Sequence, residues 1–206
     1  MATKHLSKAH PWHGVPLGEE APRVVTVYVE MVPTDTVKYE IDKETGHLKV
    51  DRPQQYSNFC PALYGFLPRT YCGEQVAALA RRVTGRDGLK GDGDPLDILV
   101  LTEKTLSHGD CLLRAVPIGG FRVIDGGEAD DKIVAVLVND GVFGSYTEMD
   151  QCPNVLIDRV EHYFLTYKLP PGAQTSSMEI AERYGRAQAQ EVIQASCRDY
   201  LEKFPY

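Results

Sequence analysis

The 206-residue sequence lacks a long apolar run, since the longest unbroken one covers only residues 133–138. A membrane-spanning helix needs about 20 apolar residues, so the sequence predicts no membrane association. The N-terminal stretch MATKHLSKAHPWHGVPLG also lacks the apolar segment of a signal peptide. We therefore expect a cytoplasmic protein.

Basic residues are also fewer than acidic residues. The chain has 22 Lys and Arg against 29 Asp and Glu, which gives a formal net charge of -7. Nucleic-acid binders usually carry a basic stripe, and an acidic surface repels a phosphate backbone. The composition therefore predicts no nucleic-acid partner, and an anionic ligand must be held by local cations or through a metal ion.

Closely paired cysteines are also absent. The five cysteines are widely spaced and form no CxxC pair, which disfavours a zinc site or a redox motif. The six histidines show no metal-ligand spacing. We expect reduced thiols, and we assign His10, Trp12 and His13 to an N-terminal surface segment.

The remaining composition is that of a globular protein, with 43% hydrophobic and 25% charged residues. A chain of this length is within the size of one domain. We predict a single domain over residues 1–206, with an N-terminal extension over 1–22 and a helical part over 154–206.

Short strands are predicted in the first two thirds of the chain. Residues 24–30 alternate strictly between apolar and polar side chains, and residues 37–42 do so before the turn KETG and the short strand HLKV. Further β-rich runs are separated by Gly, Asp and Pro, and they cover residues 97–101, 111–118, 120–124 and 132–138.

The periodicity then becomes helical. Apolar residues over 156–167 predict one helix, which Pro170, Pro171 and Gly172 end, and a stripe over 189–201 predicts a second. Short strands followed by helices favour an α+β fold, and the number of short strands favours a closed barrel.

The densest group of acidic residues is GDGDPLDI, residues 91–98, in which Asp92, Asp94 and Asp97 fall within six positions. Crowded carboxylates repel one another unless a cation compensates them. Oxygen ligands in this number favour one or more hard divalent ions. Gly91 and Gly93 allow a tight turn before the strand that follows.

Other interpretations of this motif remain open. A solvated acidic turn is one, because short motifs match by chance. An EF-hand loop starting at Asp92 fails, because Leu96 and Asp97 occupy the places of an oxygen ligand and the required Gly. A haloacid-dehalogenase-type phosphatase is a weaker alternative, because its DxD motif should follow an apolar strand rather than GRDGLKG.

A second acidic cluster, DGGEADDK, spans residues 125–132 and contains Asp125, Asp130 and Lys132. Alone it fits an ordinary hairpin loop. Together with the first cluster it supplies oxygen ligands for several metal ions, and Lys132 adds a cation for a phosphate oxygen.

The sequence resembles the soluble family I inorganic pyrophosphatases. The resemblance lies in the two acidic motifs, in the upstream segment KYEIDKETGHLKVDR and in the pair Tyr167 and Lys168. The resemblance implies a five-stranded OB-like closed β-barrel with flanking C-terminal helices. It implies hydrolysis of pyrophosphate to two orthophosphates by direct attack of a metal-activated water. We also expect a homo-oligomer, although the departures described below do not allow its subunit number to be taken from the family. The resemblance also implies several Mg²⁺ ions per active site, for which Mn²⁺, Zn²⁺ or Co²⁺ are possible substitutes.

The resemblance assigns roles position by position. It makes Asp94 the general base. It places metal ions on four carboxylates: Asp92, Asp97, Asp125 and Asp130. Glu30 and Glu40 form a supporting acidic shell. Six residues are assigned to pyrophosphate binding: Lys38, Arg52, Tyr64, Lys132, Tyr167 and Lys168. Taken singly, Lys38, Glu40, Tyr64 and Tyr167 fit a solvated strand face or core packing equally well.

The sequence also departs from the family pattern. Cys60 stands where many members have a tyrosine, and residues 70–90 form a longer segment than in compact bacterial members. The N-terminal HPWHGVPL resembles the start of the larger eukaryotic members. A non-enzymatic alternative is an oligonucleotide-binding barrel, but such modules use basic grooves with stacking aromatics, whereas these positions are mostly Asp and Glu.

Overall fold

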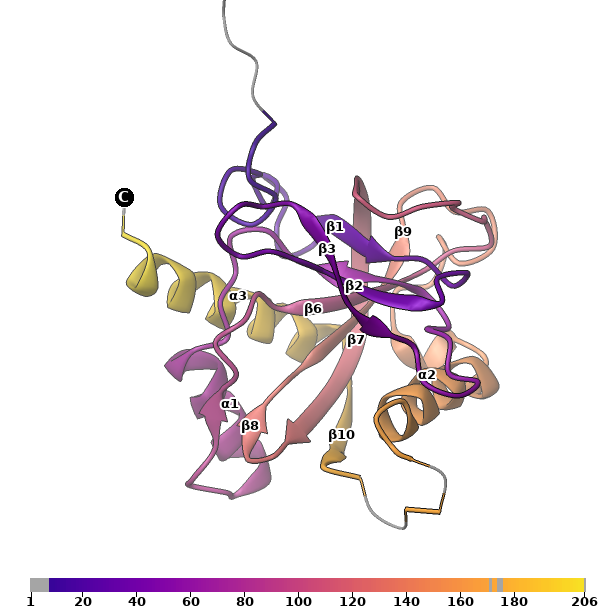
Figure 1. Ribbon diagram of the computed structural model, residues 1–206. Coiled ribbons are helices and arrows are strands. Elements are labelled where there is room, and N and C mark those ends of the chain that lie inside the picture. The colour runs from indigo at the N-terminus through magenta and orange to yellow at the C-terminus, as the bar shows by residue number, and fades with distance from the viewer. Residues whose placement is uncertain (1–7, 171, 174–175, 206) are drawn as a thin grey trace, which may run out of the picture.

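The computed structural model describes residues 8–170, 172–173 and 176–205. Strands dominate the first two thirds of this chain, and helices become prominent towards its end (Figure 1). The elements in chain order are β1 Val25–Met31, β2 Val37–Ile41, β3 Leu48–Pro53, β4 Leu63–Phe66, α1 Glu74–Thr84, β5 Lys90–Gly91, β6 Asp97–Leu101, β7 Cys111–Asp125, β8 Glu128–Ala129, β9 Lys132–Leu137, the 3-10 helix η1 Met149–Gln151, α2 Asn154–Thr166, β10 Met178–Gly185 and α3 Arg186–Lys203.

Five strands of the large sheet pair in a ring. β1 pairs with β4, β4 with β6, and β9 with β7, all antiparallel, whereas β6 and β9 are parallel. β7 also pairs antiparallel with β1, so the path of pairings returns to its first strand. β10 joins the sheet on β7, and β2 and β3 form a separate two-stranded hairpin. The predicted α+β class is confirmed.

Strand β7 is longer than the sequence predicts. Residues 111–118 and 120–124 were expected as two strands, but β7 runs without a break through Gly119 and Gly120. These glycines allow close packing rather than ending the strand. A Cβ on Gly120 would lie 2.6 Å from a ring carbon of Tyr184, and one on Gly119 would lie 2.5 Å from the Tyr184 carbonyl oxygen. The expected separation into two strands is therefore wrong.

Successive side chains along the ring strands point to opposite faces of the sheet, so the core consists of two apolar clusters. Val27 of β1 and Ile98 of β6 belong to an apolar cluster that includes residues of α1 and α3. Leu99 of β6 and Val134 of β9 point into a second cluster with Phe164 of α2. Figure 1 shows the same arrangement, with α1 and α3 on one side of the strands and α2 on the other.

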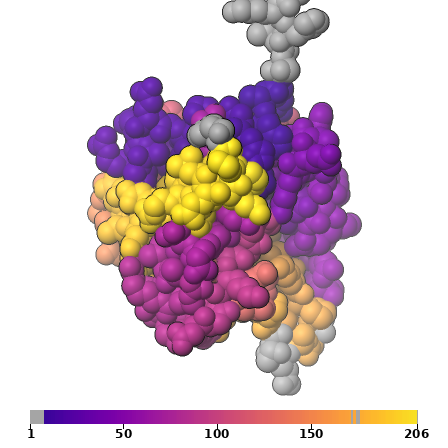
Figure 2. All heavy atoms as spheres, turned by 90° about the vertical axis from the view of Figure 1, so that its left-hand side faces the viewer, coloured from indigo at the N-terminus to yellow at the C-terminus, as the bar shows by residue number. Residues whose placement is uncertain are grey.

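The helices at residues 156–167 and 189–201 are confirmed as α2 and α3. The sequence interpretation missed β4, α1 and β10, and α1 lies in the long 70–90 segment. Figure 2 shows this segment packed directly beside α3. Among the described residues, no helix combines the length and apolar character needed to cross a bilayer.

The N-terminal residues also correct an expectation. Trp12 was assigned to the surface, but its side chain is only 3% exposed. Its indole Nε1 donates to the Thr70 carbonyl at 2.7 Å, and its ring lies edge-on to Phe204 at 5.4 Å between centroids. His10 and His13 are half-buried beside it. The partners come from residues 58 to 192 positions away, which local sequence cannot show.

Candidate active site

A cavity of about 230 Å³ opens between the β2–β3 hairpin, the acidic loop before β6 and the end of α2. All the predicted site residues except Arg52 line it, and they are Glu30, Lys38, Glu40, Tyr64, Asp92, Asp94, Asp97, Asp125, Asp130, Lys132, Tyr167 and Lys168. Arg52 lies beside the cavity, with its guanidinium carbon 5.7 Å from the centroid of the Tyr167 ring.

The centre of the cavity is fixed by strand register. Asp97 and Lys132 are the first residues of the parallel strands β6 and β9, and they are register partners. Their side chains therefore leave the same face of the sheet side by side. The Lys132 ammonium pairs with both Asp97 and Asp130. Tyr64 of β4 donates its hydroxyl to Asp97 Oδ2 at 2.5 Å.

The acidic loop presents its carboxylates through a tight turn. Gly93 has a φ of +78°, a conformation that glycine adopts without strain. The Asp94 amide donates to Asp92 Oδ1 at 2.9 Å, which closes the turn. The Cys72 amide donates to the Asp94 carbonyl at 2.8 Å, and the Gly93 amide donates to the Cys72 carbonyl at 3.0 Å. The loop is thus held against the chain that precedes α1.

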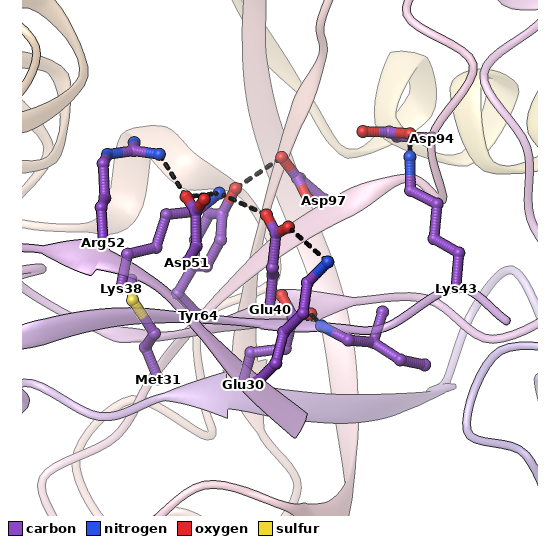
Figure 3. Close-up of polar contacts among 12 residues, drawn as sticks. Glu30, Met31, Lys38, Glu40, Lys43, Asp51, Arg52, Tyr64, Asp94 and Asp97 are labelled. Carbon is purple, nitrogen blue, oxygen red and sulfur yellow. Dashed lines mark hydrogen bonds and ion pairs between the residues drawn. The ribbon is translucent and has the colours of Figure 1, made fainter. Parts of the chain in front are cut away.

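The β2–β3 hairpin forms another wall (Figure 3). Lys38 donates to Glu40 at 3.1 Å, and its ammonium lies 3.4 Å from an oxygen of Asp51. At the end of β2, the Ile41 amide donates to Glu30 Oε1 at 2.7 Å. Glu30 is only 5% exposed, so this hydrogen bond connects a buried carboxyl group of β1 to the hairpin.

The opposite wall comes from the end of α2. Tyr167 caps this helix and stacks on Tyr163, with ring centroids 5.1 Å apart. The next residue, Lys168, donates to Asp125 Oδ2 at 2.8 Å. The predicted helix thus delivers Tyr167 and Lys168 to the cavity, as the sequence pattern indicated.

Burial and neighbouring charges shift the pKa values of several groups in the cavity. Burial, and next the charge of Asp130, raise the pKa of Asp92 to about 9. Burial and the nearby Asp97 raise the pKa of Glu30 to about 8. Burial opposes the charge on Lys132, but Asp130 and Asp97 outweigh it and raise the lysine's pKa well above its usual value. For Asp92 and Glu30, the nearby positive charge therefore does not offset burial and the neighbouring carboxylates.

This donor set fits a hard divalent cation. Oxygen donors are the ligands that Mg²⁺ prefers, and the raised pKa values show that further positive charge would favour the ionised carboxylates. Within the described parts of the chain, no three His, Cys, Asp or Glu side chains already stand in a metal-binding arrangement. At the centre, the Lys132 ammonium lies between Asp97 and Asp130 and pairs with both.

Two charged residues of the cavity were missed by the sequence interpretation. Lys43 reaches from the hairpin turn and pairs with Asp94 (Figure 3). Glu128, the first residue of β8, also lines the cavity. Both belong to motifs already singled out, KYEIDKETG and DGGEADDK. Their position inside those motifs was a usable signal, although the motifs alone do not show which members face the cavity.

An α+β fold that gathers carboxylates and lysines in one small cavity defines a class of protein. Such a site suits hard cations together with a small, highly charged anion, as in enzymes of phosphoryl transfer. Comparison with known proteins identifies the family within this class.

Residues 27–201 match the family described as "Inorganic pyrophosphatase". The chain is 50% identical over 208 aligned residues to the inorganic pyrophosphatase of Chlamydia muridarum, covering 99% of this chain and 100% of that protein. It is 41% identical over 160 residues to soluble inorganic pyrophosphatase PPA1 of Solanum tuberosum, covering 78% and 67%. The chain therefore belongs to the inorganic pyrophosphatase family.

Solved structures agree with this result. The inorganic pyrophosphatase of Thermus thermophilus matches with a TM-score of 0.76 and 26% identity, covering 94% of this chain and 99% of that one. The enzyme of Neisseria gonorrhoeae matches with a TM-score of 0.71 and 28% identity, covering 86% and 91%. The resemblance noted in the sequence, and the prediction of an enzyme of this family, are confirmed.

Proposed function

We propose that the protein hydrolyses inorganic pyrophosphate to two orthophosphates, with Mg²⁺ as its cofactor and water as the direct nucleophile. The observation that carries this proposal is the single cavity in which acidic residues from four parts of the chain face Lys38, Lys132 and Lys168. Pyrophosphate needs both kinds of group, since its own charge repels a nucleophile until cations neutralise it.

The metal-binding role belongs to Asp92, Asp97, Asp125 and Asp130, with Glu30 and Glu40 as the supporting acidic shell. Mg²⁺ ions held there would lower the pKa of a bound water, so that hydroxide forms more readily near neutral pH. Mn²⁺, Zn²⁺ and Co²⁺ are possible substitutes, because they also accept oxygen ligands.

Asp94 is the proposed general base. Its carboxylate lies at the edge of the cavity, about half exposed, where water has access. It accepts the proton of the attacking water while a new O–P bond forms and the bridging P–O bond breaks. The bridging oxygen leaves with the second phosphate, and no covalent intermediate with the enzyme is needed.

Six residues are proposed to bind the phosphate oxygens: Lys38, Arg52, Tyr64, Lys132, Tyr167 and Lys168. All of them can donate hydrogen bonds. Because Lys132 is held by Asp97 and Lys168 by Asp125, their ammonium groups, each with three hydrogens, are already positioned before substrate arrives. Tyr64 donates its only hydroxyl hydrogen to Asp97, so it must turn from Asp97 to donate to a phosphate oxygen. Removing one positioned donor typically costs about 100-fold to 1,000-fold in rate.

We further infer that the ring of β1, β4, β6, β9 and β7 is the five-stranded OB-like closed barrel of this family. The returning path of strand pairings supports it. A single domain over residues 1–206, a homo-oligomer, a cytoplasmic location and the absence of nucleic-acid partners remain our predictions.

The direct test is phosphate release from pyrophosphate, with ATP and p-nitrophenyl phosphate as alternative substrates, in excess Mg²⁺ and in EDTA. We expect fast release that is selective for pyrophosphate and that stops in EDTA. Equal release from p-nitrophenyl phosphate would instead favour a general phosphatase. Single-stranded DNA binding without metal would favour the oligonucleotide-binding alternative.

A further inference from the structure

Residues 10–14 contact both the β2–β3 hairpin and the C-terminal end of α3. We propose that this segment, the N-terminal brace, positions the hairpin and thereby sets how tightly the cavity binds its phosphate ligands. The inference rests on the proposed function, because the hairpin carries Lys38, Glu40 and the turn residue Lys43 into the cavity.

The brace is a compact turn held by its own hydrogen bonds. His10 Nδ1 accepts from the backbone amides of Trp12 at 3.2 Å and of His13 at 3.3 Å. The Gly14 amide donates to the His10 carbonyl at 2.7 Å. A Cβ on Gly14 would lie 2.9 Å from the His10 amide nitrogen, so the turn closes too tightly for a larger residue.

One side of the brace is anchored to the body of the protein. Besides the bond from Trp12 to Thr70, the Arg69 amide donates to the Trp12 carbonyl at 2.9 Å. His13 Nδ1 lies 2.8 Å from the Tyr200 hydroxyl of α3. In Figure 2 the N-terminal part of the chain borders the C-terminal helix. The brace therefore has a fixed position relative to α3.

The other side of the brace contacts the hairpin. Gly46, in the turn between β2 and β3, is buried beneath it with a φ of +74°. A Cβ there would lie 2.9 Å from both His10 Cδ2 and Pro11 Cδ. Trp12 also belongs to the same apolar cluster as Ile41, the last residue of β2. The brace thus contacts the hairpin at its turn and at a strand end.

Such contacts matter because the hairpin lies outside the hydrogen-bonded large sheet. Within the described residues, β2 and β3 pair only with each other and not with the large sheet. A two-stranded hairpin is marginally stable by itself in water. Its placement over the cavity therefore depends on side-chain contacts, which include the Glu30 bond to Ile41 and the packing of the brace.

The hairpin connects the brace to the cavity over a short distance in sequence. Lys43 lies three residues before Gly46 and pairs with Asp94, while Lys38 and Glu40 lie along β2 (Figure 3). A displacement of the turn at Gly46 therefore moves cations that face the substrate. Because the brace packs on the hairpin, we expect ligand binding to change the surroundings of the brace as well. Trp12, the single tryptophan of the chain, can report that change.

The test compares Gly46→Ala with Gly85→Ala. Both glycines have left-handed backbones, with φ of +74° and +68°, so both variants carry similar backbone strain. A Cβ at Gly85 meets nothing within 4 Å, whereas one at Gly46 collides with the brace. Calorimetry in Mg²⁺ should show phosphate binding at least about 5-fold weaker in Gly46→Ala and unchanged in Gly85→Ala. The KM for pyrophosphate should rise in parallel.

A second pair of variants avoids added strain. His10→Ala removes the ring that contacts Gly46, whereas His162→Ala removes an exposed ring on α2, outside both the brace and the cavity lining. Phosphate binding should weaken in His10→Ala and stay close to the parent value in His162→Ala. In the parent protein, titration with phosphate in Mg²⁺ should change Trp12 fluorescence in a saturable manner.

Two results would overturn the inference separately from the proposed function. If the parent binds phosphate but Gly46→Ala and His10→Ala match their controls, the brace does not position the hairpin. The same conclusion follows if phosphate binds without any change in Trp12 emission. If the parent neither binds phosphate nor releases it from pyrophosphate, the proposed function itself is wrong and the inference falls with it.

Discussion

At the scale of single residues, the cavity contains lysines that form ion pairs with some of its carboxylates. Lys132 is one example, because it is 3% exposed and pairs with both Asp97 and Asp130. A buried ammonium is tolerable only with such partners. The same arrangement leaves Asp92 and Glu30 without enough nearby positive charge, as their raised pKa values show.

The raised pKa of Glu30 predicts a pH dependence of stability in the metal-free protein. An acid whose pKa is higher in the folded state than in the unfolded state binds protons more tightly when folded. Its contribution to the free energy of unfolding therefore falls as pH rises from its ordinary pKa of 4.5 to about 8. Asp92 acts in the same direction, up to about pH 9.

Glu30→Gln should therefore lose less stability than the parent between pH 5 and 8, measured by urea unfolding in EDTA. A glutamine is uncharged and can still accept from the Ile41 amide. Glu19→Gln, at an exposed position, is the control and should follow the parent profile. An unchanged profile in Glu30→Gln would show that this carboxyl group is ionised at neutral pH without metal.

Much of the cavity could be predicted from residue motifs, because GDGDPLDI, DGGEADDK and KYEID each place several members together in sequence. The motifs alone did not assign a role to each residue, and those roles were predicted only from the family resemblance. Lys43 and Glu128 were missed, since the sequence does not reveal which side of a turn faces a cavity. Arg52 was predicted to touch the substrate site, yet its side chain lies beside Tyr167 rather than in the cavity lining.

At the scale of elements, helix α1 depends on a residue far away in sequence. Asp199 of α3 is 3% exposed, and its carboxylate accepts from three backbone amides at the start of α1. The donors are Gly73 at 2.9 Å, Gln75 at 2.8 Å and Val76 at 3.0 Å. An acidic group at this place satisfies the free amides of the first turn and interacts favourably with the helix dipole.

Asp199→Ala should therefore lower the free energy of unfolding by about 2 kcal/mol, as expected for loss of a strong helix cap. Asp199→Asn should lose less, because an amide oxygen still accepts a hydrogen bond. Urea denaturation measures both values. Glu202→Ala, which removes only one long hydrogen bond from Gln75 at 3.3 Å, is the matched surface control. A loss in Asp199→Ala no larger than in this control would contradict the capping role.

Elements with strong local periodicity were predicted well, as α2 and α3 show. Helix α1 was not predicted, although its buried residues Val76, Leu79 and Ala80 have helical spacing. Strand β10 lacks a strict apolar–polar alternation, because Glu182 and Arg183 are adjacent, and it becomes a strand through pairing with β7. Such tertiary pairing overrides weak local signals.

At the scale of the whole molecule, the fold brings acidic residues from β1, the loop before β6 and the loop before β9 to one place. Like charges gathered in this way oppose folding unless a cation binds the native state. The motifs could predict which residues take part. The sequence could not predict their distances, because those depend on pairings such as β6 with β9 and β1 with β7.

Mg²⁺ should consequently stabilise the native protein. At a free Mg²⁺ concentration 100 times Kd, one site adds about 2.7 kcal/mol to the free energy of unfolding. For a chain of this size the melting temperature should rise by roughly 5 to 10 °C relative to EDTA. Asp130→Asn should lose most of this rise, whereas Asp158→Asn, at an exposed position of α2, should keep it. An equal rise in both variants would place the metal elsewhere.

The central claim is that Asp94 removes the proton of a water that attacks pyrophosphate in this cavity. It is tested most directly by kcat for pyrophosphate in the parent and in Asp94→Asn, with phosphate and Mg²⁺ binding measured by calorimetry in both. We predict that kcat falls by about 100-fold to 10,000-fold, the usual range for a lost general base, while both ligands still bind. A variant that turns over at the parent rate would contradict the account.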